Sequence, residues 1–272
     1  MIRDGVSGKV IDQRSVKTIR GGRGFGDALY IRPFAEHFQR ENYRVRVLTD
    51  YRDVFRGLDA TVEPFNRNGA NVIAHYVGGK HNQGTTQWQD VCNSVGVQIP
   101  QRIEWKQNGG ALLDTVRAEA KGRPIVLVNG GRYPMNRPDG FGLDLLPQKR
   151  AFDVVVGALS DCLTIRIGKG PEKYGIDCEL DLSDATGAAD VIDLAAICSG
   201  IVGQCSFAIP LAEVFDKPLL MIWSVRAKDA EHEFVRMIEP RKVLSKPTDS
   251  WVLDAVSDET LRNAARAFRS VF

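Results

Sequence analysis

Short apolar runs of strand length alternate along this 272-residue chain with longer segments whose apolar residues return every three or four positions. Residues 15–20 and 43–50 have the pattern of strands, and Ile31, Phe34 and Phe38 between them share one helical face. A strand that leads into a helix and then into another strand is typical of parallel sheets. The alternation therefore predicts an α/β fold.

The alternation restarts after a connecting segment, residues 104–124, which contains the pair Gly109-Gly110. Residues 124–131 are apolar almost throughout, as in a strand that is buried on both faces. We therefore predict two Rossmann-like lobes that face a central cleft, where such folds bind ligands at the carboxyl ends of their strands. The predicted parts are an N-terminal domain, 1–118, a C-terminal domain, 119–255, and a terminal helical segment, 256–272.

Helix starts are marked in two places. Thr85 or Thr86 can cap the helix that follows it, because a threonine hydroxyl accepts a hydrogen bond from an amide of the first turn. Ser257 and Thr260, with acids between them, have capping-box spacing at the start of the terminal helix.

Composition excludes few classes of function. Hydrophobic residues make up 43% of the chain and charged residues 26%, as in ordinary globular proteins, and a net charge of +2 neither indicates nor excludes a nucleic-acid partner. No apolar run reaches the roughly 18 residues that span a bilayer, and the first residues lack the apolar core of a signal peptide. We therefore expect a cytoplasmic protein without a membrane span. The five cysteines form no C-x-x-C pair, which favours buried thiols over disulfides.

The turn Gly21–Asp27, with the sequence GGRGFGD, is rich in glycine and precedes the first helix. Gly22, Gly24 and Gly26 stand at offsets zero, two and four, whereas a dinucleotide fingerprint needs zero, two and five, so a nicotinamide cofactor is disfavoured despite Asp50 at the next strand end. Glycines in such a turn still let a ligand approach backbone amides at the helix start.

Asp27 can be interpreted in two ways. As a helix N-cap it would have a structural role, for which aspartate is well suited. As a general base at the mouth of the cleft it would accept a proton from a substrate. The two roles partly exclude each other, because a helix N-terminus lowers the pKa of a capping carboxylate, whereas a base works best with a pKa near the operating pH.

The segment GDALYIRPF, residues 26–34, resembles glycosyltransferase family 9, which includes bacterial heptosyltransferases, in its G-D-x-x-x-x-x-P spacing. The resemblance implies the two-lobed GT-B fold, with Asp27 as the catalytic base. It also implies that the terminal helix packs back on the N-terminal domain. Pro33 strengthens the likeness, since proline is costly inside a helix.

Residues 191–223 resemble the donor-binding motif of the same family. The matching positions are Val202, Gly203, Ser206, Leu211, Ala212 and Pro218. Gln204 stands in place of the family's asparagine, Cys205 in place of its acid, Phe207 in place of its glycine and Pro210 in place of its histidine. The likeness thus implies a nucleotide-sugar enzyme, and the departures argue against ADP-heptose as its donor.

The resemblance also implies the residues of the donor site. The loop after the strand 124–131 faces the donor phosphates in the family, and Arg132 is the favoured cation to neutralise the leaving diphosphate, ahead of Arg137 and Lys149. The predicted donor-binding residues are Gly26, Asn129, Gly130, Arg132, Gln204, Cys205 and Ser206.

The expected activity is metal-independent, inverting transfer of a sugar from a nucleotide-diphosphate sugar to an acceptor hydroxyl. No Asp-x-Asp pair stands on an expected loop and no histidines have ligand spacing, so we predict no metal and no cofactor besides the nucleotide-sugar co-substrate. The acceptor is a saccharide or a modified nucleic-acid base. Three alternatives remain open: a phage-type glycosyltransferase of DNA bases, a nucleotide-sugar epimerase and a non-catalytic nucleotide-sugar-binding protein.

Overall fold

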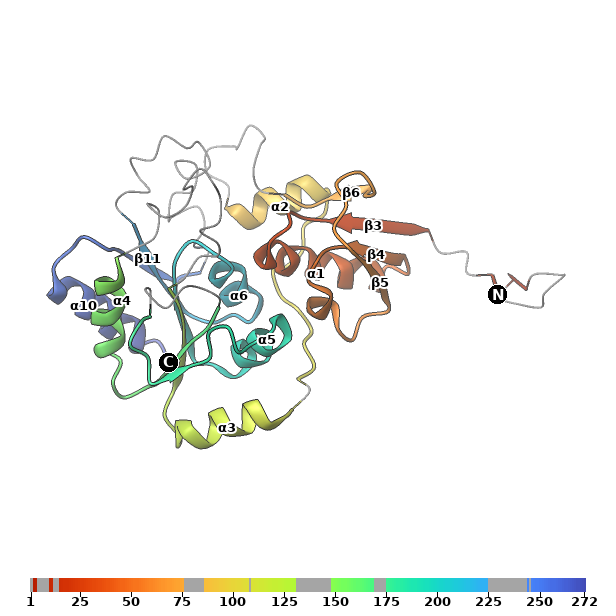
Figure 1. The fold of residues 1–272 in the computed structure, drawn as a ribbon. Helices are drawn as coiled ribbons and strands as arrows, with labels where there is room; N and C mark the ends of the chain where they lie inside the picture. Colours follow the sequence, from red (N-terminus) through yellow and green to blue (C-terminus); the bar gives the residue numbers. More distant parts are fainter. Residues whose placement is uncertain are drawn as a thin grey trace, which may run out of the picture.

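The computed structural model describes residues 2–3, 10–11, 15–75, 86–107, 109–130, 148–168, 175–224, 244 and 246–272. Its longer strands form two separate sheets in which every neighbouring pair is parallel, one in each half of the chain (Figure 1). The predicted α/β fold with two Rossmann-like lobes is therefore confirmed.

The first half contains a four-stranded sheet in the order β5-β4-β3-β6. Its strands are β3 (Val16–Arg20), β4 (Arg44–Leu48), β5 (Ala60–Glu63) and β6 (Val72–Ile73). Its helices are α1 (Phe25–Arg40), the 3-10 helix η1 (Arg52–Phe55) and α2 (Gln87–Val95). A short antiparallel pair, β1 (Ile2–Arg3) with β2 (Val10–Ile11), precedes them.

The second half contains a six-stranded sheet in the order β12-β11-β10-β7-β8-β9. Its strands are β7 (Ile125–Asn129), β8 (Leu163–Arg166), β9 (Leu180–Asp181), β10 (Gly200–Gly203), β11 (Leu219–Trp223) and β12 (Ser250–Leu253). Its helices are α3 (Ala111–Ala120), α4 (Lys149–Gly157), α5 (Ala188–Ile197), α6 (Ala208–Val214) and α10 (Asp258–Arg269).

Helices cover both faces of the second sheet (Figure 1). Side chains alternate along each strand, so Val126 and Val128 of β7 pack with α4 and α10, whereas Ile125 and Leu127 pack with α3, α5 and α6. This double burial explains the nearly continuous apolar sequence of β7. The predicted boundary at residue 118 falls inside α3, which packs against α5, and the domain bounds themselves stay predictions.

The terminal helix corrects one expectation. We expected it to pack on the N-terminal domain, but α10 packs on α4, β11 and β12 of the second half. Its buried residues Leu261, Ala265 and Phe268 repeat at intervals of three and four and complete the cluster around Val252. The chain leaves β12 at Leu253 and enters α10 at Asp258, so this apolar stripe meets the nearest open face of its own sheet.

The first helix begins earlier than predicted. Gly24, not Asp27, is the N-cap of α1, and Asp27 is the third helical residue. The predicted caps Thr86 of α2 and Ser257 of α10 are confirmed, since each side chain accepts a hydrogen bond from an amide three residues later. Among the described helices, none is long and apolar enough to cross a membrane.

Among the described elements of the two halves, α1 packs against α6 and η1 packs against α5. Buried apolar residues of both halves belong to one continuous cluster, which includes Ile31 of α1 and Leu211 of α6. The contact between α1 and α6 brings together the turn after β3 and the loop after β10.

Candidate active site

Asp27 folds back over the glycine-rich turn that precedes it. Its Oδ2 accepts a hydrogen bond of 2.9 Å from the backbone N–H of Gly24. A Cβ atom on Gly22 would lie 2.5 Å from the same oxygen, and one on Gly24 would lie 3.0 Å from it. Glycine is therefore needed at position 22 to make room for the Asp27 carboxylate, which is partly exposed.

Tyr51 lies beside this carboxylate, just after the end of β4. Its ring centroid is 5.5 Å from that of Phe25, the first residue of α1. Burial raises the pKa of Tyr51, and the charges of Asp50 and Asp27 raise it further. The phenol is thus in the field of Asp27 and stays protonated at neutral pH.

Asp50 is engaged elsewhere. Its Oδ2 lies 2.7 Å from Nε of Arg23, and its Oδ1 accepts a hydrogen bond of 3.2 Å from the Phe65 amide. Hydrogen bonds from Arg23 and from the Phe65 amide lower the pKa of Asp50. Asp50 therefore ties the glycine-rich turn to the loop after β5, which is a structural role and not that of a ribose-binding acid.

The second half contributes a buried polar cluster at the carboxyl ends of β7, β8 and β10. Asn129, fully buried at the end of β7, accepts a hydrogen bond of 2.8 Å from the Ser206 hydroxyl and donates one of 3.3 Å to the Ile167 carbonyl. The Gln204 amide donates to the Gly130 carbonyl at 3.5 Å. Asn129, Gly130, Gln204 and Ser206, which were predicted together, are therefore in direct contact.

Two glycines in this region are required by packing. Gly168 has a φ of +102°, and a Cβ atom there would lie 2.6 Å from the Asn129 amide nitrogen. A Cβ atom on Gly130 would lie 1.9 Å from Cδ1 of Ile176. The need for glycine at position 130 thus arises from the core and does not by itself indicate a ligand.

The two sites meet through aromatic residues. The Phe25 and Phe207 rings are 5.1 Å apart, and a Cβ atom on Gly26 would lie 3.3 Å from Cα of Phe207 and 3.4 Å from Pro210. Residues directly after β3 therefore touch residues directly after β10. The junction therefore joins the segment after β3, which carries Asp27, to the segment after β10, which carries Ser206.

Of the three cations that the sequence predicts for the diphosphate, the structure describes one. Arg132 and Arg137 lie outside the described residues. Lys149 is described, and its ammonium lies 2.5 Å from the Asp153 carboxylate one turn along α4. That ion pair gives Lys149 a local partner.

Cys205 is partly exposed between Gln204 and Ser206 and packs against the apolar core. Burial raises the pKa of the other four thiols, to about 11 for Cys162 and to about 12 for Cys178 and Cys198. Within the described part of the chain, no group of three or more His, Cys, Asp or Glu side chains is arranged to hold a metal ion.

Sequence reasoning missed Phe25 and Tyr51 as members of the site, and it noted Phe207 only as a departure from a motif. Tyr51 could have been found, because it follows a strand end in the half that carries Asp27. The contact between Phe25 and Phe207 could not, since the two residues are 182 positions apart in the sequence.

By sequence, the chain matches no protein-family model and no curated protein. Its structure is similar to those of solved glycosyltransferases, among them the following three. A family 9 glycosyl transferase from Veillonella parvula DSM 2008 matches with a TM-score of 0.64 at 8% identity, over 96% of this chain and 98% of that one. E. coli ADP-heptose LPS heptosyltransferase II matches with a TM-score of 0.60 at 12% identity, over 93% and 98%.

The third is the dodecameric iron-containing heptosyltransferase TibC, solved in complex with ADP-D-β-D-heptose. It matches with a TM-score of 0.56 at 14% identity, over 91% of this chain and 66% of that one. The fold is therefore shared with family 9 glycosyltransferases along nearly the whole chain, in agreement with the resemblance of residues 26–34 and 191–223. The likeness establishes the fold, and function has to be argued from the site.

Proposed function

We propose that the protein is a glycosyltransferase that moves a sugar from a nucleotide-diphosphate sugar to an acceptor hydroxyl. The observation that carries the proposal is the contact of Phe25 and Gly26 with Phe207. It joins the Asp27 turn of one half to the Ser206 loop of the other. A carboxylate then faces a polar loop across the junction of two lobes, in a fold that known glycosyltransferases share.

In the proposed reaction Asp27 is the general base. Its carboxylate takes the proton of the acceptor hydroxyl while the acceptor oxygen forms a bond to the anomeric carbon. The bond from that carbon to the diphosphate oxygen breaks on the opposite face, and the nucleoside diphosphate leaves with the electron pair. The configuration at the anomeric carbon is inverted, and the proton ends on Asp27.

The second half would hold the leaving group. Negative charge grows on the diphosphate as the bond breaks, and preorganised donors that face this charge supply the largest catalytic contribution in many enzymes. We assign this role to the loop of Gln204, Cys205 and Ser206, with Gly130 beside it and Arg132 as the cation. The side chain of Ser206 is held in place by Asn129.

The acceptor would enter from the first half, where Tyr51 and Phe25 flank Asp27. Phenol and phenyl rings suit the apolar face of a sugar or the face of a nucleobase, so both acceptor classes, saccharide and modified nucleic-acid base, are retained. No membrane or metal partner is part of the proposal.

A thermal-shift screen with ADP-, UDP-, GDP-, CMP- and dTDP-sugars tests the proposal. A ligand that binds the native state raises the melting temperature, by an amount that corresponds to about 2.7 kcal/mol at 100 times its dissociation constant. We expect the sugars of one nucleotide to stabilise the protein. The protein should slowly hydrolyse these nucleotide-sugars or slowly transfer their sugar. If none of the five stabilises it, the proposal is wrong.

A further inference from the structure

Trp105, in the segment that connects the two halves, lies close to two guanidinium groups. Cζ of Arg32 is 4.8 Å from the centroid of the Trp105 ring, and Cζ of Arg56 is 4.5 Å from it. Arg32 belongs to α1, and Arg56 directly follows η1. Cations close to an indole ring attract its π-electrons, so two arginines of the first half hold the ring.

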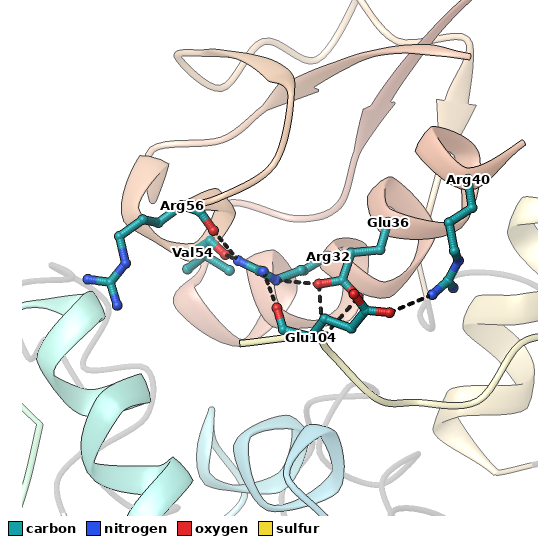
Figure 2. A network of polar contacts seen from close by, with 6 residues as sticks. All are labelled: Arg32, Glu36, Arg40, Val54, Arg56 and Glu104. Atoms are coloured by element: carbon teal, nitrogen blue, oxygen red, sulfur yellow. Dashed lines mark hydrogen bonds and ion pairs between the residues drawn. The ribbon is translucent and has the colours of Figure 1, made fainter. Parts of the chain in front are cut away.

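A buried ion pair inside α1 holds the same connecting segment. Arg32 is 1% exposed and lies 2.8 Å from the carboxylate of Glu36, and it also donates to the carbonyls of Val54, Arg56 and Glu104 (Figure 2). The Glu36 carboxylate accepts the Glu104 amide at 3.1 and 3.2 Å. Both backbone groups of Glu104 are therefore bound to charged side chains of α1, and such hydrogen bonds are stronger than neutral ones.

The second half enters this network through one carboxylate. Asp193, on α5, accepts a hydrogen bond of 2.7 Å from the Trp105 indole N–H. Its two oxygens also lie 3.1 and 3.3 Å from Nη2 of Arg56. Asp193 is 7% exposed and the Arg56 side chain 27%, so this ion pair is better shielded from water than an exposed surface pair.

We propose that Asp193 is a latch between the two halves, which fixes the orientation of α1 relative to α5 through Trp105 and Arg56. Helix α1 runs without interruption from Phe25 to Arg40, so an anchor at Arg32 and Glu36 sets the direction of its first turn. Asp193 therefore positions Asp27 relative to the second half, without contact to substrate. This inference concerns the arrangement of the halves and holds whatever reaction the site performs.

Another ion pair offers a matched control. Arg102, two residues before the connecting segment, lies 3.0 Å from Asp216 of the second half, but the two side chains are 71% and 58% exposed. Like Asp193, Asp216 is a carboxylate of the second half that pairs with an arginine of the first half, and Asp→Asn changes the charge equally at both positions. Exposure predicts that the Arg102–Asp216 pair contributes little.

The test compares Asp193→Asn with Asp216→Asn by hydrogen exchange and small-angle X-ray scattering. The side-chain oxygen of an asparagine at 193 can still accept the hydrogen bond from the Trp105 indole N–H. Toward Arg56, however, the asparagine presents either an N–H donor or an uncharged oxygen. We expect exchange in residues 102–107 to become at least about tenfold faster in D193N, because a buried charged hydrogen bond is lost. The maximum dimension of D193N should also increase, while D216N matches the unchanged protein in both measurements.

A purely structural role for Asp193 would lower the melting temperature without separating the halves, so scattering distinguishes the two roles. Equal exchange and equal dimensions in D193N and D216N would overturn the latch. If circular dichroism shows that D193N does not fold, Trp105→Phe takes its place, because it removes the indole N–H and keeps an aromatic ring beside Arg32 and Arg56. A folded W105F with unchanged exchange and dimensions would likewise overturn the proposal.

Discussion

Asp27 combines a structural and a proposed chemical role that two substitutions can separate. Its carboxylate accepts the Gly24 amide at the start of α1. An asparagine oxygen can accept the same hydrogen bond, so Asp27→Asn should keep the melting temperature and donor binding. Asparagine cannot act as a general base, however, so Asp27→Asn should reduce turnover at least about a hundredfold. Asp27→Ala should reduce turnover and, because the hydrogen bond from the Gly24 amide is lost, also cost about 1 kcal/mol of stability.

The measurement is steady-state turnover with the donor that the thermal-shift screen identifies, together with a thermal melt of each variant. Near-normal turnover of D27N would end the assignment of Asp27 as base. The epimerase alternative would then be favoured.

A substitution at Gly22 also tests the role of the Asp27 carboxylate. A methyl group at this position would overlap Oδ2 of Asp27, a terminal side-chain atom that accepts the Gly24 amide and can shift by rotation of the side chain. Gly22→Ala should therefore leave the fold intact but misplace Asp27, with turnover lowered roughly tenfold to a hundredfold. Gly157→Ala is the control, because a Cβ there meets nothing within 4 Å. Turnover of G22A equal to that of G157A would show that the position of the carboxylate does not matter.

Helix α1 contains a charge pair that cannot be exchanged simply for apolar residues. Burial raises the pKa of Glu36 and lowers that of Arg32, because both charged forms lose hydration. Replacing one partner of such a pair should cost about 3–5 kcal/mol, whereas replacing both by apolar residues is often neutral. Here Arg32 and Glu36 also hold backbone groups of Val54, Arg56 and Glu104, which would be left without partners.

We therefore expect the double variant R32M/E36L to be less stable than the unchanged protein by about 2 kcal/mol or more, as measured by urea unfolding. Arg40→Ala is the control, since the Arg40–Glu104 pair is exposed and should contribute less than about 1 kcal/mol. A double variant as stable as the unchanged protein would contradict the argument from backbone groups.

Helix α10 stabilises the second half and not the first. Phe268 is 2% exposed, and a Cβ on Gly200 of β10 would lie 2.6 Å from its ring. Phe268→Ala should cost about 3–5 kcal/mol, because it leaves a cavity under the sheet. Val271→Ala, at a side chain that is 44% exposed, should change stability by less than about 0.5 kcal/mol. Equal melting temperatures of the two variants would show that α10 does not seal this core.

The whole molecule should unfold in one transition although it has two sheets. One apolar cluster includes Ile19 and Phe34 of the first half and Ile201 and Leu211 of the second. Neither half can unfold without exposing part of the core of the other, which couples the two transitions. Calorimetry should give equal calorimetric and van't Hoff enthalpies of unfolding. Two resolved transitions would show that the contacts of α1 with α6 and of η1 with α5 are too weak for this coupling.

The molecule's likeness to solved glycosyltransferases extends over nearly the whole chain at 8–14% identity. The α/β alternation, the caps Thr86 and Ser257 and the polar residues at the ends of β7 and β10 could all be predicted from sequence. The position of Asp27 in its helix could be predicted only to within a turn. Helix N-caps depend on backbone angles, and Gly24 adopts those angles as readily as Asp27 would.

The sequence by itself determined the elements, because the periods of strands and helices and the turn chemistry of glycine depend on neighbours a few residues apart. It also determined which strands are buried on both faces. Only the tertiary structure decided that α10 stays with its own sheet, that Phe25 meets Phe207 and that Asp193 holds Trp105. These contacts join residues far apart in the chain, and they depend on how two twisted sheets and their helices pack against each other, which no local pattern encodes.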